Sequence, residues 1–394
     1  MIDPLATQWR REFPIVDTCT YLVSHSLGAM PRRAMESVHA FADSWMTRGV
    51  RAWSEGWWEM GRTVGDLLAP IIGAPPGSIS MHQNASVAQA IIGSCFRYEG
   101  RRRKIVLTGL EFPTNIYVFE GFRRYGAEII VVPGQDTIRT SLERLLDAID
   151  DETVLVPLSL VLFRSSYIQD ARAVIARAHS VGAHVILDIY QAAGVIPIDL
   201  GALGADFAVG GSVKWLCGGP GAGYLYVRPD LGGRLEPAFV GWAAHAEPFA
   251  FEPAAIRYAD PPERFQSGTP NVPALYSARA GYEIVAKIGV AAIRDKSLRL
   301  TRRLIDRATK AGYCVNTPAS DAERAGAVIV DVPDGYAVTQ ELIRREVIVD
   351  YRPGAGIRLS PHFYNTDEEV EHAMDVLEDV VGHAASDASR RQEL

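Results

Sequence analysis

A lysine, a carboxylate and a cluster of glycines stand close together in the middle of the chain, and their types suit one kind of chemistry. Asp188 ends an apolar run, and Lys214 follows a second one in the sequence Ser212-Val213-Lys214, just before GGPGAG. A buried lysine among small residues can form a Schiff base with an aldehyde cofactor. A carboxylate beside it can keep a pyridine nitrogen protonated, which makes the ring an electron sink. The sequence therefore predicts a cofactor site of this type.

A mainly parallel sheet would bring these two residues to one place. The apolar runs at 184–187 and 206–209 have the length of buried strands, and helical and strand patterns alternate along the chain. Such alternation is typical of an α/β fold. Ligands of open α/β sheets bind outside the carboxyl ends of the strands. Because Asp188 and Lys214 each follow a strand, we expect them to lie at that edge.

Length and composition indicate an ordinary globular protein of two parts. The chain has 394 residues, with 48% hydrophobic and 22% charged side chains. This length favours one large and one small domain, and we expect a large N-terminal part over residues 1–283 and a small C-terminal domain over 284–394. The net charge of -7 argues against a nucleic-acid partner.

Cysteine usage and hydropathy exclude several other classes. The four cysteines lie far apart and form no CxxC pair, so neither a metal site nor a disulfide framework is expected. No apolar stretch has the length of a membrane span, and residues 1–14 lack the apolar core of a signal peptide. We therefore expect a cytoplasmic protein that does not bind membranes.

Several motifs occur in an order that resembles one enzyme family. The sequence is similar to fold-type I pyridoxal phosphate (PLP) enzymes of the aminotransferase class V family, and within it to the kynureninase-like branch. The resemblance implies PLP as the cofactor, and a large domain with a mainly parallel seven-stranded-type sheet beside a small α/β C-terminal domain. The motifs that carry it are YLVSHSLGAMP (21–31), EFPTN (111–115), the stretch 188–227, FVGWAAH (239–245) and GTPN (268–271).

The resemblance also implies which residues hold the cofactor. Asp188 and Lys214 would be catalytic, and Phe112 would stack on the PLP ring. Ala85 and Ser86 stand at an expected helix start, where free N–H groups suit a phosphate. The full set implied to bind PLP is Lys214, Asp188, Ala85, Ser86, Phe112, Ser212, Gln191, Trp242 and Thr269.

Two further groups of residues concern the partner subunit and the substrate. Trp242 and Thr269 match residues that reach the phosphate from the neighbouring subunit, which implies a homodimer with shared active sites. Arg358 matches the residue that binds the α-carboxylate of an amino acid substrate, and a guanidinium suits bidentate carboxylate recognition. Ser26 would lie near the same carboxylate.

Three positions depart from true kynureninases close to the lysine. Gln191 stands where they have a histidine, Val213 replaces a tyrosine, and Cys217 replaces an asparagine. A tyrosine or histidine can act as a general acid, whereas valine cannot and glutamine does so poorly. Tyr190 and Tyr258 could donate a proton, but neither stands at a matching position.

The substrate side differs as well. A substrate-contacting histidine of kynureninases has no counterpart near Trp53, and Leu160, Leu162 and Phe163 replace polar residues of the relatives. We therefore expect a PLP-dependent hydrolase or lyase that cleaves a side-chain bond of an α-amino acid through an external aldimine and a carbanion. Its substrate is expected to differ from kynurenine.

Other activities stay open at this level. The same carbanion leads to transamination, β-elimination or epimerisation, so a class V aminotransferase, a C–S or β-lyase, or an epimerase of a specialised pathway are alternatives. A cysteine desulfurase is disfavoured because the loop 351–356 has no cysteine. A non-catalytic effector-binding module is disfavoured because no DNA-binding domain fits before Tyr21.

Overall fold

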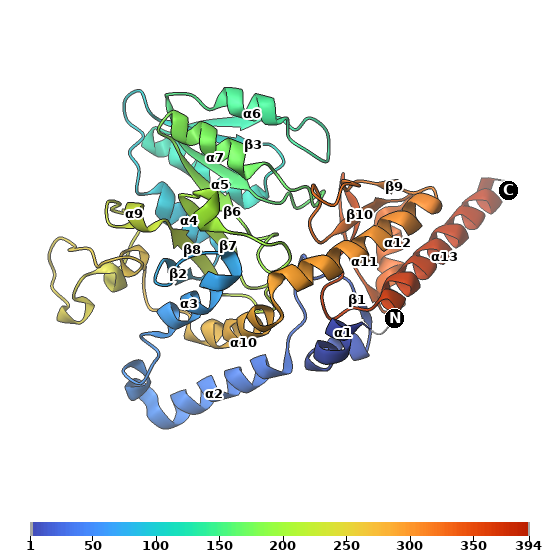
Figure 1. The fold of residues 1–394 in the computed structure, drawn as a ribbon, viewed down its shortest axis with the longest axis horizontal. Helices are drawn as coiled ribbons and strands as arrows, with labels where there is room; N and C mark the ends of the chain where they lie inside the picture. Colours follow the sequence, from blue (N-terminus) through green and yellow to red (C-terminus); the bar gives the residue numbers. More distant parts are fainter. Residues whose placement is uncertain (1–2, 393–394) are drawn as a thin grey trace.

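A seven-stranded sheet forms the centre of the larger part of the molecule (Figure 1). The computed structural model describes residues 3–392. The strands in spatial order are β2 (Ile79–His82), β8 (Gly223–Val227), β7 (Phe207–Gly211), β6 (His184–Asp188), β5 (Thr153–Ser159), β3 (Lys104–Thr108) and β4 (Glu128–Val132). Only β8 runs against its neighbours β2 and β7; the other pairings are parallel. The predicted α/β architecture with a mainly parallel sheet is confirmed.

Helices cover both faces of this sheet. One core contains apolar side chains of the helices α3 (Met60–Ile72), α6 (Leu142–Ala148), α7 (Ala171–Ser180) and α10 (Val272–Ile288). The opposite core includes side chains from α4 (Ala85–Gly93), α5 (Pro113–Glu120), η4 (Gly121–Tyr125) and α9 (Pro229–Gly232). Several helices begin at side-chain caps: at the start of α7, Asp170 accepts a hydrogen bond from Ala173 N–H.

A second, four-stranded sheet forms the centre of the smaller part. Its strands in spatial order are β12 (Asp350–Arg352), β13 (Gly356–Leu359), β10 (Val328–Asp331) and β9 (Cys314–Val315), and all pairings are antiparallel. The helices of this part are α11 (Val290–Lys310), α12 (Gly335–Arg344) and α13 (Asp367–Gln392). Gly289, at a φ of +84°, separates α10 from α11, because a left-handed residue ends a helix.

Residues 3–23 contact the smaller part, although that part comes much later in the sequence. They contain α1 (Pro4–Trp9), η1 (Arg10–Glu12), η2 (Pro14–Asp17) and β1 (Thr20–Tyr21). β1 pairs in parallel with β11 (Val347–Ile348), and Val23 bridges Ser360. Figure 1 shows this N-terminal segment beside the smaller part. The predicted division into residues 1–283 and 284–394 stays a prediction. Residues 1–2 and 393–394 of these two ranges lie outside the described part of the chain.

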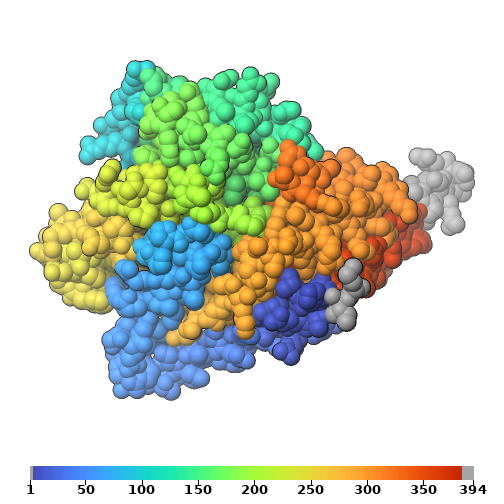
Figure 2. All heavy atoms as spheres, in the orientation of Figure 1, coloured from blue at the N-terminus to red at the C-terminus, as the bar shows by residue number. Residues whose placement is uncertain are grey.

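The remaining elements form the periphery. The long helix α2 (Arg32–Arg48) packs on α10 and leads to η3 (Gly49–Trp53). A protruding stretch after α9, yellow at the left edge of Figure 2, contains η5 (Trp242–Ala244), η6 (Pro248–Ala250) and η7 (Glu263–Phe265). The short helix α8 (Leu200–Leu203) precedes β7. Within residues 3–392, no helix is both long and apolar enough to span a membrane.

Candidate active site

Lys214 lies against two aromatic rings just beyond the end of β7. Its ammonium nitrogen is 4.3 Å from the ring centroid of Tyr190 and 5.8 Å from that of Phe112. Burial lowers the pKa of the amine to about 8, against the opposing attraction of Asp188. A larger share of the amine is therefore unprotonated near neutral pH than for an exposed lysine, and a neutral amine is the form that attacks an aldehyde.

Asp188 is the last residue of β6, and its buried carboxylate accepts a hydrogen bond from Tyr190 N–H at 2.9 Å. Burial raises its pKa, while this N–H, the charge of Lys214 and a hydrogen bond from the Asn115 side chain oppose the rise. The structure thus brings the predicted acid and lysine together at the carboxyl edge of neighbouring strands.

Helix α4 begins at Ala85, where the sequence predicts a phosphate site. Asn84 caps the helix by accepting from Val87 N–H at 3.0 Å. The first N–H groups of a helix have no partner within the helix, and Ala85 and Ser86 stand there. A Cβ on Gly223 would come within 2.6 Å of Asn84 Cα. Only glycine at this position of β8 therefore lets the helix start approach the strand so closely.

Ser212 and Gln191 use their side chains in contacts within the protein. The Ser212 hydroxyl donates to the Ala222 carbonyl at 2.6 Å and lies 2.6 Å from the Tyr282 hydroxyl. The Gln191 amide donates to the His25 carbonyl at 3.1 Å and accepts from the Trp215 indole at 3.3 Å. Both side chains are therefore engaged within the protein, and their direct contact with the cofactor stays a prediction.

The segment 21–31 crosses directly over the backbone of Lys214. Gly28 N–H donates to the Val213 carbonyl at 2.8 Å, and a Cβ on Gly28 would collide with the Lys214 carbonyl. Position 28 therefore requires glycine, because the segment passes so close to the backbone of Lys214 that a side chain would not fit. Ser26 lies two residues earlier and is half-buried, so the segment places it near the lysine loop.

Arg358 is held in place before any substrate arrives. It lies on β13 and is buried, and it pairs through two nitrogens with Asp350 while donating to the Phe163 carbonyl at 2.9 Å. His25 also contacts Asp350, at 3.0 Å. Burial would raise the pKa of Asp350, but hydrogen bonds from His25 and Arg358 outweigh burial and lower it. Burial lowers the pKa of His25 to about 4, so this imidazole is neutral.

The apolar residues of segment 158–170 divide into two groups. Leu160 and Leu162 are buried in or beside the core. Phe163 meets the ring of Phe112 edge to face, with centroids 5.2 Å apart. The apolar character that the sequence predicts on this side of the site is therefore carried, among these three, by Phe163.

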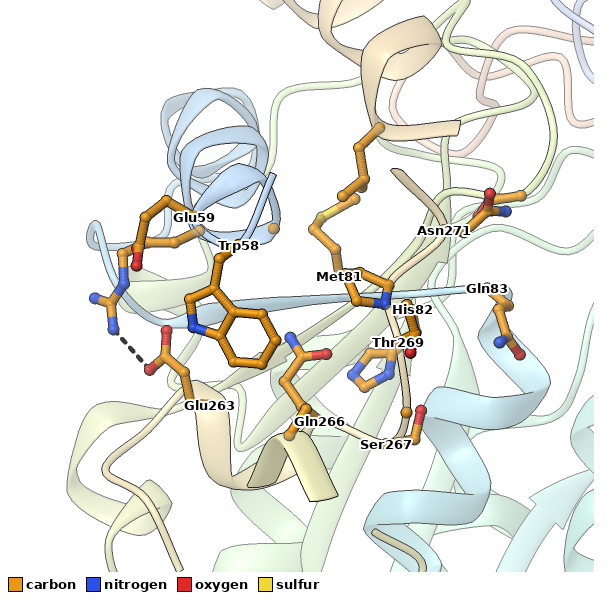
Figure 3. A pocket seen from close by; sticks show the side chains of 17 residues that line it. Trp58, Glu59, Met81, His82, Gln83, Glu263, Gln266, Ser267, Thr269 and Asn271 are labelled. Carbon is orange, nitrogen blue, oxygen red and sulfur yellow. Dashed lines mark hydrogen bonds and ion pairs between the residues drawn. The ribbon is translucent and has the colours of Figure 1, made fainter. Parts of the chain in front are cut away.

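Trp242 and Thr269 belong to an aromatic group and a cavity that do not include the lysine. Trp242 packs in an exposed aromatic group with Trp58, Phe249 and Phe251, at centroid distances of 5.2–6.0 Å. Thr269 lines a cavity of about 210 Å³ between α3, β2 and the stretch 266–271 (Figure 3). The lining of that cavity contains neither Lys214 nor Asp188.

The residues around Lys214 fit PLP. An amine of lowered pKa, a buried carboxylate, a flat ring and a helix start converge there, and glycines make the required close approaches. Across the described residues, no group of three or more His, Cys, Asp or Glu side chains is arranged to hold a metal ion.

Sequence reasoning assigned no role to several residues that the structure places here. Asp350 accepts from Arg358, Glu111 accepts from Ser159 N–H, and Asn115 donates to Glu111. Asp350 stands in the DYR triplet before the glycine-rich turn, and its spacing of eight residues from Arg358 on adjoining strands was the signal that could have found it.

Solved structures with the same architecture are enzymes of one fold type. A cysteine desulfurase from Thermococcus onnurineus NA1 superposes with a TM-score of 0.84 at 22% identity, over 97% of this chain and 99% of that one. A variant of C-DES with glycine covalently linked to its PLP cofactor gives 0.85, again at 22% identity, over 94% and 99%. The fold is therefore the fold-type I fold of PLP-dependent transferases, as predicted.

Sequence comparison defines the family. The family model described as aminotransferase class-V matches residues 20–372. A kynureninase of Pseudomonas fluorescens is 33% identical, covering 94% of this chain and 91% of its own length. A kynureninase of Burkholderia pseudomallei is 32% identical over 98% and 96%, and one of Bacillus thuringiensis is 31% identical over 95% and 91%. The chain belongs to the aminotransferase class V family and is kynureninase-like.

Proposed function

We propose that this protein is a PLP-dependent enzyme that cleaves a side-chain bond of an α-amino acid by kynureninase-like chemistry, on a substrate other than kynurenine. The observation that carries the proposal is the convergence of Lys214, Asp188 and Phe112 at one strand edge, in a chain about one third identical to kynureninases. Bound PLP supplies an electron sink for the bonds at Cα of the amino acid.

The residues of the site have distinct roles in this proposal. Lys214 holds the cofactor and moves the proton at Cα, for which its lowered pKa suits it. Asp188 keeps the ring nitrogen protonated. Arg358 would bind the α-carboxylate, and the ring of Phe112 would stack on the cofactor ring. Hydrolytic cleavage then needs water at the side-chain carbonyl and a proton for Cβ.

We assign the donation of that proton to Tyr190. Its ring lies beside the Lys214 amine, and burial raises its pKa to about 12, so the phenol keeps its proton at neutral pH. Tyr258 is less suited, because its hydroxyl donates to the Pro237 carbonyl at 2.9 Å in the protruding stretch. In this proposal, Tyr190 provides the proton donor that Val213 lacks.

The apolar contacts of Phe163 support a changed substrate. Its ring meets that of Phe112 edge to face, and its backbone carbonyl accepts from the guanidinium of Arg358. Gln191 is engaged with His25 and Trp215, so it is poorly placed to contact a substrate. We infer that the pocket takes an amino acid whose side chain is less polar than that of kynurenine.

We also propose a homodimer with shared active sites. Trp242 and Thr269 are the two predicted phosphate contacts from a neighbouring subunit; Trp242 packs on Trp58, and the cavity that Thr269 lines does not include Lys214. Trp242, Phe249 and Phe251 are exposed. Contact with a second copy would cover these rings and bring Thr269 to the partner's cofactor.

The substrate is tested by incubating the PLP-loaded protein with kynurenine and with a panel of other amino acids, with products followed by mass spectrometry. We expect little or no anthranilate from kynurenine, and cleavage of another amino acid. Efficient release of anthranilate would overturn the changed substrate. A keto acid that keeps the whole carbon skeleton of the substrate would identify an aminotransferase. Pyruvate, formed with loss of the side-chain group, would identify a β-lyase.

The cofactor attachment is tested separately. Borohydride reduction followed by peptide mapping should place a pyridoxyl group on Lys214, and Lys214→Ala should take up none. A pyridoxyl group on any other lysine would refute the assignment of this site. Lys287 serves as the internal comparison, because its amine also faces an aromatic ring, 5.6 Å from Trp9.

A further inference from the structure

A buried histidine, His25, has a partner on both ring nitrogens, and the proposed reaction does not use it. It belongs to the segment 21–31 and is 1% exposed. Its Nδ1 hydrogen-bonds the Ser360 hydroxyl, and its Nε2 lies 3.0 Å from Oδ1 of Asp350. Its backbone N–H also donates to the Ser360 hydroxyl, at 3.1 Å. The ring is therefore held at both ends, by a hydroxyl on one side and a carboxylate on the other.

These partners decide which ring nitrogen of His25 carries the proton. A carboxylate only accepts hydrogen bonds, so Nε2 donates to Asp350. Burial lowers the pKa of His25 to about 4, so the ring is neutral near pH 7 and Nδ1 is an acceptor. The Ser360 hydroxyl is the donor to Nδ1, because its other neighbour, the Leu22 carbonyl, already accepts from Ser360 N–H at 2.7 Å. The contacts therefore define one tautomer, with the proton on Nε2.

The carboxylate of Asp350 receives four donors, one for each of its lone-pair positions. Oδ1 accepts from Nε of Arg358 at 2.7 Å and from Nε2 of His25 at 3.0 Å. Oδ2 accepts from Nη2 of Arg358 at 2.5 Å and lies 3.0 Å from Nη2 of Arg352. Asp350 and Arg352 lie on β12, and Arg358 lies on β13. Of the three donor residues, His25 is the one that comes from outside these strands, and it is the neutral one.

The segment that carries His25 is also fixed to the lysine loop. Three residues further on, Gly28 N–H donates at 2.8 Å to the carbonyl of Val213, which directly precedes Lys214. Lys214 follows a strand of the seven-stranded sheet, whereas Asp350 lies in the four-stranded sheet. One short segment therefore joins two halves of the candidate site that come from different sheets.

We propose that His25 is a positioning residue: its Nε2–H holds the Asp350 carboxylate, and through it sets where the Arg358 guanidinium stands relative to Lys214. The inference rests on the proposed role of Arg358 as the receptor for the α-carboxylate. An amino acid would be held at the cofactor on Lys214 and at Arg358 together, so the spacing of these two groups decides whether both contacts form. The neutral ring adds no charge that would compete with Arg358 for Asp350.

Two substitutions of the same chemical type separate this role from packing. In His25→Gln the amide nitrogen can take the place of Nε2 and donate to Asp350. In His25→Asn the amide is one methylene shorter, so it reaches Ser360 but not Asp350. The two variants therefore differ in the one contact on which the proposal depends.

The matched control is His179→Asn, which shortens the same kind of contact elsewhere. Nε2 of His179 lies 2.9 Å from Oδ2 of Asp206. Asp206 comes directly before β7, whereas Lys214 follows the end of that strand. This pair therefore lies at the opposite edge of the sheet, and its loss should leave ligand binding as in the wild type.

The first measurement compares two ligands of the PLP-loaded protein, L-alanine and ethylamine, because ethylamine is alanine without the carboxylate. Titration followed by the absorbance of the cofactor gives the affinity for each. His25→Asn should weaken the affinity for L-alanine on the order of tenfold, as loss of a hydrogen bond to a charged group does, and should leave that for ethylamine unchanged. His25→Gln should stay close to the wild type. Equal losses for both ligands, or no loss in His25→Asn, would overturn the proposal.

Arg358→Ala separates this proposal from the role on which it rests. If Arg358→Ala loses the preference for L-alanine while His25→Asn keeps it, the role of His25 fails and that of Arg358 stands. If Arg358→Ala keeps the preference, or the wild type has none, the proposed role of Arg358 is the one that fails.

The second measurement uses cofactor-free protein with ¹⁵N-labelled histidine, observed by NMR. The signals of His25 are assigned by their loss in His25→Gln. At pH 7 we expect a neutral ring with its proton on Nε2. A proton on Nδ1, or a charged ring, would overturn the proposal whatever the role of Arg358. If His25→Asn does not fold, Ser360→Ala replaces it in the ligand comparison and should weaken the affinity for L-alanine alone, because the ring loses its anchor at Nδ1.

Discussion

The guanidinium of Arg358 forms a two-point ion pair with Asp350, with Nε 2.7 Å from Oδ1 and Nη2 2.5 Å from Oδ2. Its Nη1 donates to the Phe163 carbonyl. An arginine has five N–H groups, so three are engaged with protein oxygens and two are left. Two N–H groups on the terminal nitrogens match the two oxygens of a planar carboxylate. Asp350 therefore orients the proposed receptor in advance.

Arg358→Lys should weaken substrate binding while PLP stays bound. Lysine keeps the charge but loses the fork, and a charged hydrogen bond contributes roughly 1.5–3 kcal/mol, so KM should rise about 10- to 100-fold. Steady-state kinetics with the identified amino acid measure this. Arg352→Lys is the control, because Arg352 also contacts Asp350, at 3.0 Å, yet is more exposed. An unaffected KM in Arg358→Lys would rule out the assigned role.

The pH dependence of cofactor capture should follow the lowered pKa of Lys214. The neutral amine reacts, so the capture rate in cofactor-free protein should rise with pH and level off above about 8, well below the ordinary lysine value of 10.5. Because the charge of Asp188 holds the proton on the amine, Asp188→Asn should move the midpoint to lower pH. Stopped-flow absorbance measures the rate. A rate that still rises near pH 10 would contradict the burial of this amine.

Tyr190→Phe should lower turnover with little change in KM. Removal of a proton donor typically costs about 10²- to 10⁴-fold in rate. The phenol is removed while the ring beside Lys214 is kept, so cofactor binding should persist. Tyr258→Phe provides the control and should retain full turnover. If the two variants lose the same small amount of activity, another group protonates the product.

Shared sites predict complementation between two inactive variants. One variant carries Lys214→Ala, and the other carries Trp242→Ala with Thr269→Ala. In a mixed dimer, one site would combine the intact lysine of one subunit with the intact pair of the other, so random mixing should restore about one quarter of the sites. Activity after co-refolding measures this. Shared sites would be excluded if an equimolar mixture of the two variants stayed inactive after co-refolding. An active monomer in sedimentation would exclude them as well.

The sequence predicted those parts of the site that follow from strand order. Asp188 and Lys214 each come directly after a buried strand, and strands that run in parallel end at the same edge. The start of α4 was predictable because Asn84 is a good cap before an apolar helix. In these cases the local pattern fixes where the side chain points, so the structure confirms the expected placement.

Contacts between distant segments could not be predicted in this way. The hydroxyl of Ser212 faces Tyr282, which lies on α10, and Gln191 reaches the backbone of His25. The pairing of Arg358 with Phe163 joins residues 195 positions apart. None of these leaves a periodic signal, because each depends on how the two sheets and the N-terminal segment pack together.

The course of the N-terminal segment has a consequence for biosynthesis. Residues 20–23 pair with β11 and with Ser360, and Gly28 lies on the backbone of Lys214. A ribosome releases the chain from its N-terminus, and long-range contacts form last. The lysine loop therefore stays uncovered on the nascent chain until β11 and Ser360, which hold the N-terminal segment, have emerged. Trapping of stalled chains of increasing length with an aldehyde would show when this loop closes.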